Sequence, residues 1–232
     1  MINAMSSTSH VTLNPPDYSR PSTTINFRIA TLNCRGLAKT ADVSVRNHFI
    51  RYLRTRPLDL LAFQETHAST ISLQETFHLQ FQAIDSLWSP HCGLVCFSPL
   101  LSFSDTVFSP CGRIITTKVS HAQDAFAPVY VTVMYAPANR RDRFLFLDNM
   151  AQNRAPLLPI CNYRHILLSD FNYTYATYPP SSPPRQAPIP WLSFVDAQLQ
   201  ECVTDLDCAP EITFSKSAAR SCIDYVFGSL DL

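Results

Sequence analysis

Residues 165–173, HILLSDFNY, contain a short apolar run that stops abruptly at Ser-Asp-Phe-Asn. Three apolar residues are too few for a helix, so residues 166–168 predict a strand that is buried on both faces. Side chains alternate along an extended chain, so Asp170 and Asn172 should point to one side of the strand end. Phe171 should then turn toward the core.

A carboxylate beside a carboxamide at a strand end suits metal-assisted hydrolysis. One group can orient or deprotonate a water, while the other donates to the oxyanion that develops opposite it. An ordinary strand-to-loop turn explains the same residues, because Asp and Asn are common turn formers. The other strand ends of the chain help to separate these two interpretations.

Two earlier segments also end on polar side chains. Residues 25–33, INFRIATLN, alternate as a strand and end on Asn33. Asp42 is positioned to cap a helix over residues 42–54, and the apolar run 58–63 that follows it leads directly to Gln64 and Glu65. A strand, a helix and a strand whose ends turn polar predict a layered α/β domain with a site along one sheet edge.

The remaining pattern continues the same architecture. Residues 1–24 are rich in Ser, Thr, Asn and Pro and predict a disordered segment, while residues 25–232 predict one domain. The Pro-rich residues 176–190 predict an extended surface loop, either a spacer or a loop that touches substrate. We expect helices at residues 70–81, 140–150 and 191–199, and strands at 87–98, 113–119, 128–135, 211–215 and 222–227.

Composition excludes some classes of protein. The chain has 232 residues and a formal net charge of zero, which gives no general attraction to nucleic acid or membrane. A polyanion would therefore have to be met by a local basic patch. The eight cysteines form no paired CxxC set, and residues 1–24 lack the apolar segment of a secretory signal. We expect reduced thiols and an intracellular location, nuclear or cytoplasmic, with no membrane partner.

Six motifs in a fixed order make the chain resemble a known superfamily. They are TLNCRGL around Asn33, LLAFQETH around Glu65, CGLVCFS from Cys92, VYVTVMYAP ending at Pro137, ILLSDFN around Asp170 and SCIDYVFGS around Asp224. The pattern, over residues 26–229, resembles the endonuclease/exonuclease/phosphatase superfamily of apurinic/apyrimidinic endonucleases and deoxyribonuclease I. The strongest likeness is to the endonuclease domains of non-LTR retrotransposons.

The resemblance implies a fold and a set of site residues. The fold would be a four-layer α/β/β/α sandwich of two mixed sheets flanked by helices. Glu65 would be a direct ligand of Mg²⁺ or Mn²⁺ with Asn33 as a nearby polar contact. Tyr135 would lie near the phosphate, Asp170 would align or deprotonate the attacking water, and Asn172 would help to hold the phosphoryl oxygens. Asp224 would be the carboxylate of the last motif.

The resemblance has one large departure, because the Ser-Asp-His motif that closes the family's fold is absent. All seven histidines precede Asp224. We therefore expect a C-terminally truncated domain that lacks the terminal strand and leaves an open sheet edge beside the Asp224 strand.

The implied function is metal-dependent nicking of DNA by a monomer. One alternative is a degenerate, non-catalytic module that binds nucleic acid, and another is a phosphatase acting on small or lipid phosphoesters. The candidate phosphate contacts for nucleic acid are outward arginines of two helices, Arg46, Arg51, Arg54, Arg140, Arg141 and Arg143. A plain solvated helix face explains these arginines equally well.

Overall fold

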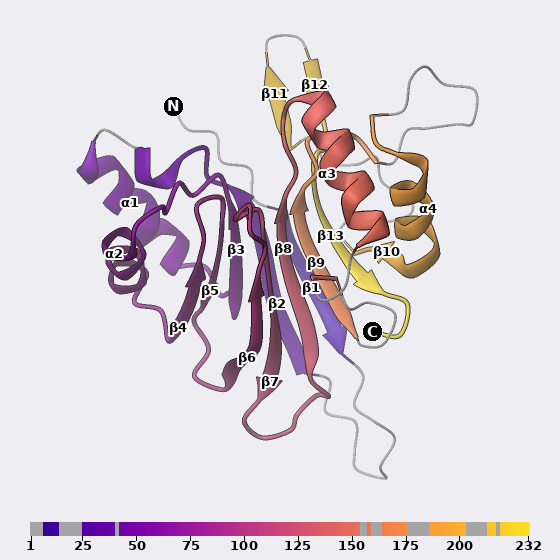
Figure 1. The fold of residues 1–232 in the computed structure, drawn as a ribbon. Helices are drawn as coiled ribbons and strands as arrows, with labels where there is room; N and C mark the ends of the chain where they lie inside the picture. The colour runs from indigo at the N-terminus through magenta and orange to yellow at the C-terminus, as the bar shows by residue number, and fades with distance from the viewer. Residues whose placement is uncertain are drawn as a thin grey trace.

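A computed structural model describes residues 7–13, 25–39, 42–153, 157–158, 164–175, 186–202, 213–216 and 219–232. These residues form two β-sheets that pack face to face, with α-helices on the outer side of each sheet (Figure 1). The arrangement confirms the predicted four-layer α/β/β/α sandwich. No helix within these ranges is long and apolar enough to span a bilayer.

The first sheet has five strands in the order β1-β2-β3-β5-β4. Their bounds are β1 Ser7–Leu13, β2 Ile25–Asn33, β3 Leu60–Gln64, β5 Cys92–Cys96 and β4 Asp85–Trp88. The β2–β3 pair is parallel and the other pairs are antiparallel. The predicted strand over residues 87–98 is thus two strands joined by a tight turn.

The second sheet has six strands in the order β10-β13-β9-β8-β7-β6. Their bounds are β10 Leu199–Glu201, β13 Asp224–Ser229, β9 His165–Asp170, β8 Val129–Tyr135, β7 Ile114–His121 and β6 Leu101–Phe108. Only β8 and β9 run parallel in this sheet. A separate hairpin pairs β11 Phe214–Lys216 with β12 Ala219–Ser221.

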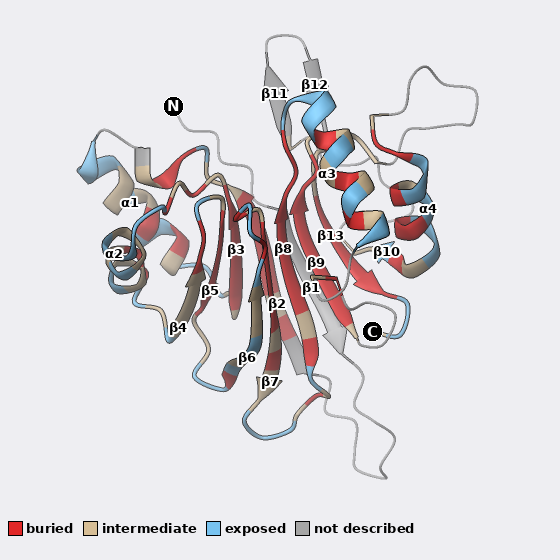
Figure 2. Ribbon diagram, viewed as in Figure 1, coloured by how far each residue is buried: buried red, intermediate tan, exposed pale blue. Residues whose placement is uncertain are grey.

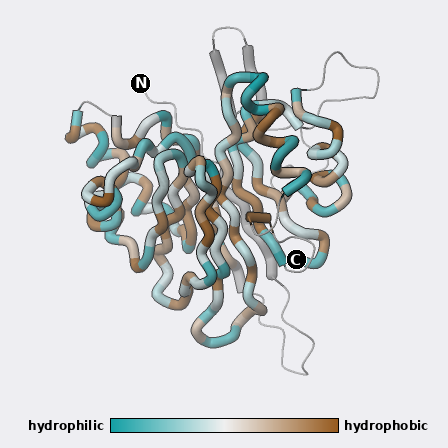
Figure 3. The backbone as a smooth tube through the Cα atoms, viewed as in Figure 1, coloured by the Kyte–Doolittle hydropathy of each residue, from teal (hydrophilic) through white to brown (hydrophobic). Residues whose placement is uncertain are grey.

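The main core lies between the two sheets. Val129, Val131, Val133 and Tyr135, which alternate along β8, all belong to this core. Figure 2 shows the central strands β3, β5, β8, β9 and β13 as largely buried, and Figure 3 shows brown, apolar residues running along the same strands. β9 is buried at all six positions, as expected for a strand covered on both faces.

Four α-helices form the outer layers. α1 Val43–Arg54 and α2 Ile71–Phe81 pack with the five-stranded sheet, while α3 Arg140–Gln152 and α4 Ile189–Gln198 pack with the six-stranded sheet. Asp42 caps α1 as predicted, because its side chain accepts from the Ser44 and Val45 amides. Val45 of α1 is 42% exposed. A short 3-10 helix, η1 Leu37–Lys39, precedes α1.

Two expectations about strands were wrong. Residues 7–13 form β1, although residues 1–24 were predicted to be disordered, because their backbone pairs with the otherwise open edge of β2 over seven residue pairs. The rest of that segment, and residues 176–185 of the predicted loop, lie outside the described residues. The edge of β13 is also not fully open, because the backbone of β10 pairs with it at Phe227, Gly228 and Ser229.

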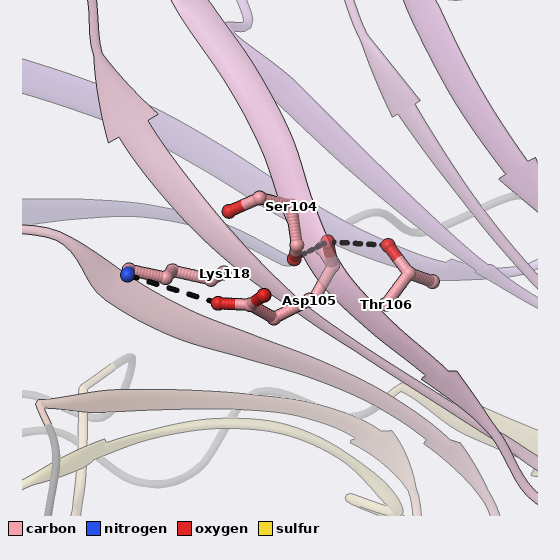
Figure 4. A network of polar contacts seen from close by, with 5 residues as sticks. Ser104, Asp105, Thr106 and Lys118 are labelled. Atoms are coloured by element: carbon pink, nitrogen blue, oxygen red, sulfur yellow. Dashed lines mark hydrogen bonds and ion pairs between the residues drawn. The ribbon is translucent and has the colours of Figure 1, made fainter.

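Strand β6 was missed altogether because its alternation is interrupted. The register between β6 and β7 shifts between Ser104 and Val107, and Asp105 lies in the left-handed region at φ 50°. The Asp105 carboxylate lies 3.7 Å from Lys118 Nζ of β7, and Figure 4 shows the two side chains facing each other. Thr106 Oγ1 is 2.9 Å from Thr117 Oγ1. A bulge of this kind twists an edge strand and limits its pairing with other chains.

Candidate functional site

The polar strand ends meet at one edge of the sandwich. Asn33 ends β2 and is paired in register with Gln64, which ends β3 of the same sheet. In the other sheet Asp170 ends β9, and it is paired with Tyr135 at the end of β8 and with Asp224 at the start of β13. Parallel neighbours place their carboxyl ends together, and the antiparallel β13 contributes its amino end.

Side-chain hydrogen bonds join the two sheets at this edge. Asn33 Nδ2 donates to Asp170 Oδ2 at 2.6 Å and to Glu65 Oε1 at 2.9 Å. Tyr135 Oη donates to the same Glu65 oxygen at 2.9 Å. The structure therefore brings together four of the six predicted site residues in one hydrogen-bonded group, two from each sheet.

Asn33 faces the site with its amide nitrogen. Both carboxylates can only accept when ionised, and the amide oxygen of Asn33 accepts from the Arg35 backbone amide at 2.9 Å. In this orientation the amide nitrogen of Asn33 bridges Glu65 and Asp170 as a donor. Its amide oxygen points to the loop, where it accepts from the Arg35 amide. The geometry fits a polar contact beside a metal better than a ligand oxygen.

The loops at this edge are held in strained backbone conformations. Seven non-glycine residues of the described chain have positive φ, and four of them, Arg35, Glu65, His67 and Asn172, lie at the site. The left-handed region costs an L-residue about 1–2 kcal/mol, so it persists only where surrounding contacts impose it. Around Arg35, Glu65 and His67 those contacts are backbone hydrogen bonds of 2.8–3.0 Å from the amides of Cys34, Gly36 and Ala38 to the carbonyls of Gln64, Glu65 and Thr66.

Three carboxylates share the site and repel one another. Burial, followed by the charge of Asp224, raises the pKa of Asp170 well above its usual value, against the hydrogen bonds from Asn33 and Asn172. Burial also raises the pKa of Asp224 to about 6, and the charge of Glu65 adds to this shift. A hydrogen bond from Thr213 and the charge of Arg35 act in the opposite direction. Burial and Glu65 also raise the pKa of Tyr135, which keeps its hydroxyl protonated.

A hard divalent cation fits this group of oxygens. Asp224 Oδ1 is buried and has no hydrogen-bond partner among the described residues, and it faces a site that already holds excess negative charge. Within the same ranges no three His, Cys, Asp or Glu side chains form a preformed cage for an ion. Mg²⁺ keeps several waters and binds through one or two carboxylates, so this donor set suits it better than a metal that needs a closed cage. Glu65 and Asp224 could supply the oxygens.

Asn172 fixes Asp170 and the neighbouring strand end. Its backbone amide donates to Asp170 Oδ1 at 2.8 Å, and its side-chain nitrogen donates to the Ala136 carbonyl at 2.8 Å. The side chain thus ties the end of β9 to the end of β8, and one hydrogen of its NH₂ group is used there. Phe171, as predicted, is fully buried, in the outer core of the six-stranded sheet.

Two basic residues at the site, His91 and Arg113, were not found by sequence reasoning. The His91 ring lies 5.9 Å from the Tyr135 ring and 6.4 Å from the His67 ring, measured between centroids. The Arg113 guanidinium lies 4.9 Å from the centre of the Tyr135 ring. The signal for His91 was the antiparallel register, since the start of β5 must lie opposite the end of β3, where Glu65 follows.

The arginines proposed as one nucleic-acid contact do not share a face. Arg46, Arg51 and Arg54 belong to α1, while the other three belong to α3, and these helices cover opposite sides of the sandwich (Figure 1). Arg143 is buried and donates to the carbonyls of Pro137, Ala138 and Gln186, so its predicted outward position was wrong. The reason is that α4 packs beside α3 and leaves backbone carbonyls that only a buried donor can satisfy.

Comparisons with known proteins identify the fold. No family model matches the sequence, and no curated protein sequence matches it. Among solved structures, the catalytic domain of human Nocturnin with bound sulfate superposes with a TM-score of 0.61 at 14% identity, covering 96% of this chain and 86% of that chain. A mannosyl-6-phosphatase from Bacteroides thetaiotaomicron gives 0.59 at 13% identity, over 87% and 85% of the two chains.

A third similar structure carries the superfamily name. An endonuclease/exonuclease/phosphatase family protein from Bacteroides thetaiotaomicron gives a TM-score of 0.58 at 12% identity, covering 98% of this chain and 82% of that chain. At these identities the likeness shows the fold alone. The chain therefore has the endonuclease/exonuclease/phosphatase fold, as the ordered motifs predicted.

Proposed function

We propose that this chain hydrolyses phosphoesters with the help of a divalent metal ion, and that its substrate is a DNA phosphodiester. The observation that carries the proposal is the hydrogen-bonded group of Asn33, Glu65, Asp170 and Tyr135 at the junction of the two sheets. It combines a fixed carboxylate, a second carboxylate and a protonated hydroxyl, which are the parts that hydrolysis of a phosphoester needs.

Each side chain has a task in this proposal. Asp170 takes a proton from the attacking water, because both of its oxygens are fixed by donors, and its burial and the charge of Asp224 raise its affinity for protons. When substrate binds, the Tyr135 hydroxyl turns from Glu65 and donates to a phosphoryl oxygen, and Asn172 helps to hold the phosphoryl group. Glu65 binds the ion, with Asn33 as the bridging donor and Asp224 as a further oxygen. When bound, Mg²⁺ withdraws charge from the phosphoryl oxygens and orients the reacting groups.

Similar folds support the reaction class. One of the superposed proteins is named as a mannosyl-6-phosphatase, and another holds a sulfate, which has the shape and charge type of a phosphate. The choice of DNA rests on the motif pattern, which resembles retrotransposon endonucleases. Arg35 and Arg113 are basic residues at the rim that could meet a phosphate backbone.

A phosphatase acting on small or lipid phosphoesters is the second candidate. The observations that favour it are the net charge of zero and the separation of the α1 and α3 arginines, which leaves no broad basic face built from them. A small substrate would need only the few basic side chains at the rim. DNA, in contrast, is bound largely through many phosphate contacts.

The test compares two substrates with matched variants. Supercoiled plasmid and mannose 6-phosphate are incubated with the protein in Mg²⁺ or in EDTA, and nicking and phosphate release are measured. We expect Mg²⁺-dependent nicking that falls by roughly 10³-fold or more in Glu65→Gln and Asp170→Asn. Asp105→Asn is the control, because this exposed carboxylate lies on β6 and pairs with Lys118.

The outcomes separate the candidates. Phosphate release from mannose 6-phosphate without nicking would select the phosphatase. Salt-sensitive DNA binding without hydrolysis of either substrate would select a non-catalytic nucleic-acid-binding module. Equal hydrolysis by the parent and all three variants would show that Glu65 and Asp170 do not belong to the active site.

A further inference from the structure

His91 is held at the site by backbone contacts from both of its neighbouring loops. The His91 carbonyl accepts from the Thr66 amide at 3.4 Å, next to Glu65. The turn that carries it is closed by buried Ser89, whose amide donates to the Cys92 carbonyl at 2.9 Å and whose hydroxyl donates to the Gly112 carbonyl at 2.7 Å. The backbone that carries the imidazole is therefore positioned by the fold before any ligand arrives.

The surroundings of the ring decide which nitrogen can meet a ligand. His91 Nδ1 is buried and has no hydrogen-bond partner within the described part of the chain, although the residue as a whole is only half-buried. A buried N–H without an acceptor is rarer than a buried acceptor without a donor, so the proton of a neutral imidazole belongs on Nε2. Burial and the charges of Arg113 and His67 lower the pKa of His91, and the charge of Glu65 opposes this shift. The net lowering of the pKa favours the neutral ring.

The neighbours of His91 make this corner suitable for an anion. Tyr135 lies beside the ring, and the Arg113 guanidinium covers the Tyr135 ring while donating to the Tyr135 carbonyl at 3.4 Å. Glu65 accepts from the Tyr135 hydroxyl, and Asp170 is paired with Tyr135 across β8 and β9. The site therefore has an acidic side, suited to a cation, and a donor-rich side formed by Tyr135, His91 and Arg113.

We propose that His91 is a phosphate-binding residue, whose Nε2–H donates to a non-bridging oxygen of the phosphoryl group beside Tyr135. The inference rests on the proposed phosphoester hydrolysis and adds a residue that the motif pattern does not contain. His91 is brought to the reaction site from the start of β5, in the sheet that also carries Glu65. The imidazole meets the phosphoryl group from the donor-rich side.

The test uses inorganic phosphate as the probe and does not depend on turnover. The protein is labelled with ¹⁵N in its histidine rings and titrated with phosphate in the presence of Mg²⁺, and the Kd and the His91 ring signals are recorded. A hydrogen bond to a charged group is worth about 1.5–3 kcal/mol, so His91→Ala should raise the Kd by roughly 10-fold or more. His48→Ala, at an exposed position of α1, should leave it unchanged.

Two conservative variants separate binding from a structural role. The amide nitrogen of Gln reaches the position of Nε2, whereas that of Asn reaches only the position of Nδ1. We expect His91→Gln to recover most of the phosphate affinity and His91→Asn to recover little, with all variants retaining the circular dichroism spectrum of the parent. Equal Kd values for His91→Ala and the parent, or equal recovery by Gln and Asn, would overturn the inference.

The same series distinguishes failure of this inference from failure of the proposed function. If the parent hydrolyses a substrate and His91→Ala leaves the phosphate Kd and KM unchanged, the function stands and the role of His91 is rejected. If no substrate is hydrolysed but phosphate moves the Nε2 signal of His91, the function is rejected and the binding role of His91 is retained.

Discussion

Replacing Asp224 with Asn should stabilise the protein above pH 6 when divalent ions are absent. Asp224 and Asp170 are directly opposite each other on antiparallel strands, where two like charges destabilise a sheet. Asn keeps the shape of the side chain and can still accept a hydrogen bond from Thr213. It can also donate toward Asp170, which turns a repulsive pair into an attractive one.

The size and sign of the effect follow from the pKa of Asp224. Folding raises this pKa from 3.8 to about 6, so the unfolded chain loses the proton first as pH rises. Asp224 therefore has no destabilising effect on the folded state below pH 3.8. Its effect grows between pH 3.8 and pH 6, and the full loss of stability is present above pH 6. A shift of about 2 units corresponds to roughly 3 kcal/mol, an upper value because Asp170 and Asp224 titrate together.

The assay is urea unfolding in EDTA at pH 4 and at pH 7.5. The Asp224→Asn variant should be more stable than the parent at pH 7.5 by up to about 3 kcal/mol, or roughly 6–12 °C in Tm for a domain of this size, and equal to it at pH 4. Asp105→Asn is the control, since this side chain is 62% exposed and Asn tolerates its positive φ. Mg²⁺ should stabilise the parent more than Asp224→Asn. A variant that is less stable at pH 7.5, or that gains equally at both pH values, would refute the reasoning.

Three further substitutions test the fold. Gly93→Ala should destabilise the protein by about 1–3 kcal/mol, because the new Cβ would lie 2.4 Å from a Trp88 ring carbon; unchanged urea unfolding, followed by tryptophan fluorescence, would contradict this packing. Asp42→Ala should cost about 0.5–2 kcal/mol by removing the cap of α1, and Asp42→Ser should recover most of it; equal loss in both variants would speak against capping. Arg143→Met should cost at least about 2 kcal/mol in thermal unfolding, because three carbonyls lose their donor, and a neutral result would show that water satisfies them.

Patterns of local sequence predicted the central strands and helices well. β9 could be identified because a run of three apolar residues bounded by polar ones has few interpretations. α1 could be identified because Asp42 is a residue that commonly caps the start of a helix. The polar strand ends could be linked to one site because parallel strands place their carboxyl ends together. The edge strands β1, β6 and β10 escaped prediction. β1 and β10 are stabilised by pairing with strands that lie further along the chain, and the alternation of β6 is interrupted by its bulge.

The positions of these residues along the strands and helices were predicted more completely than the roles of their side chains. Asn33 could be assigned to the site, but only the three-dimensional structure shows that its nitrogen bridges two carboxylates. Arg143 follows the helical pattern of a surface residue, and its burial depends on the packing of α4. His91 lies 26 residues from Glu65 in the sequence, and only the register of β3 with β5 brings the two ends together.

The hydrogen bond between Asn33 and Asp170 joins residues 137 positions apart and spans the two sheets. Closing a loop of that length has an entropic cost that must be met before any contact across it is formed, and long-range pairings of this kind slow folding. Each sheet can pair its own strands earlier, over shorter separations. The site is therefore assembled only when the sheets dock, and a ligand held between them must leave before the layers can separate. Binding at this edge should accordingly slow unfolding of the whole sandwich, with both layers protected together in hydrogen exchange.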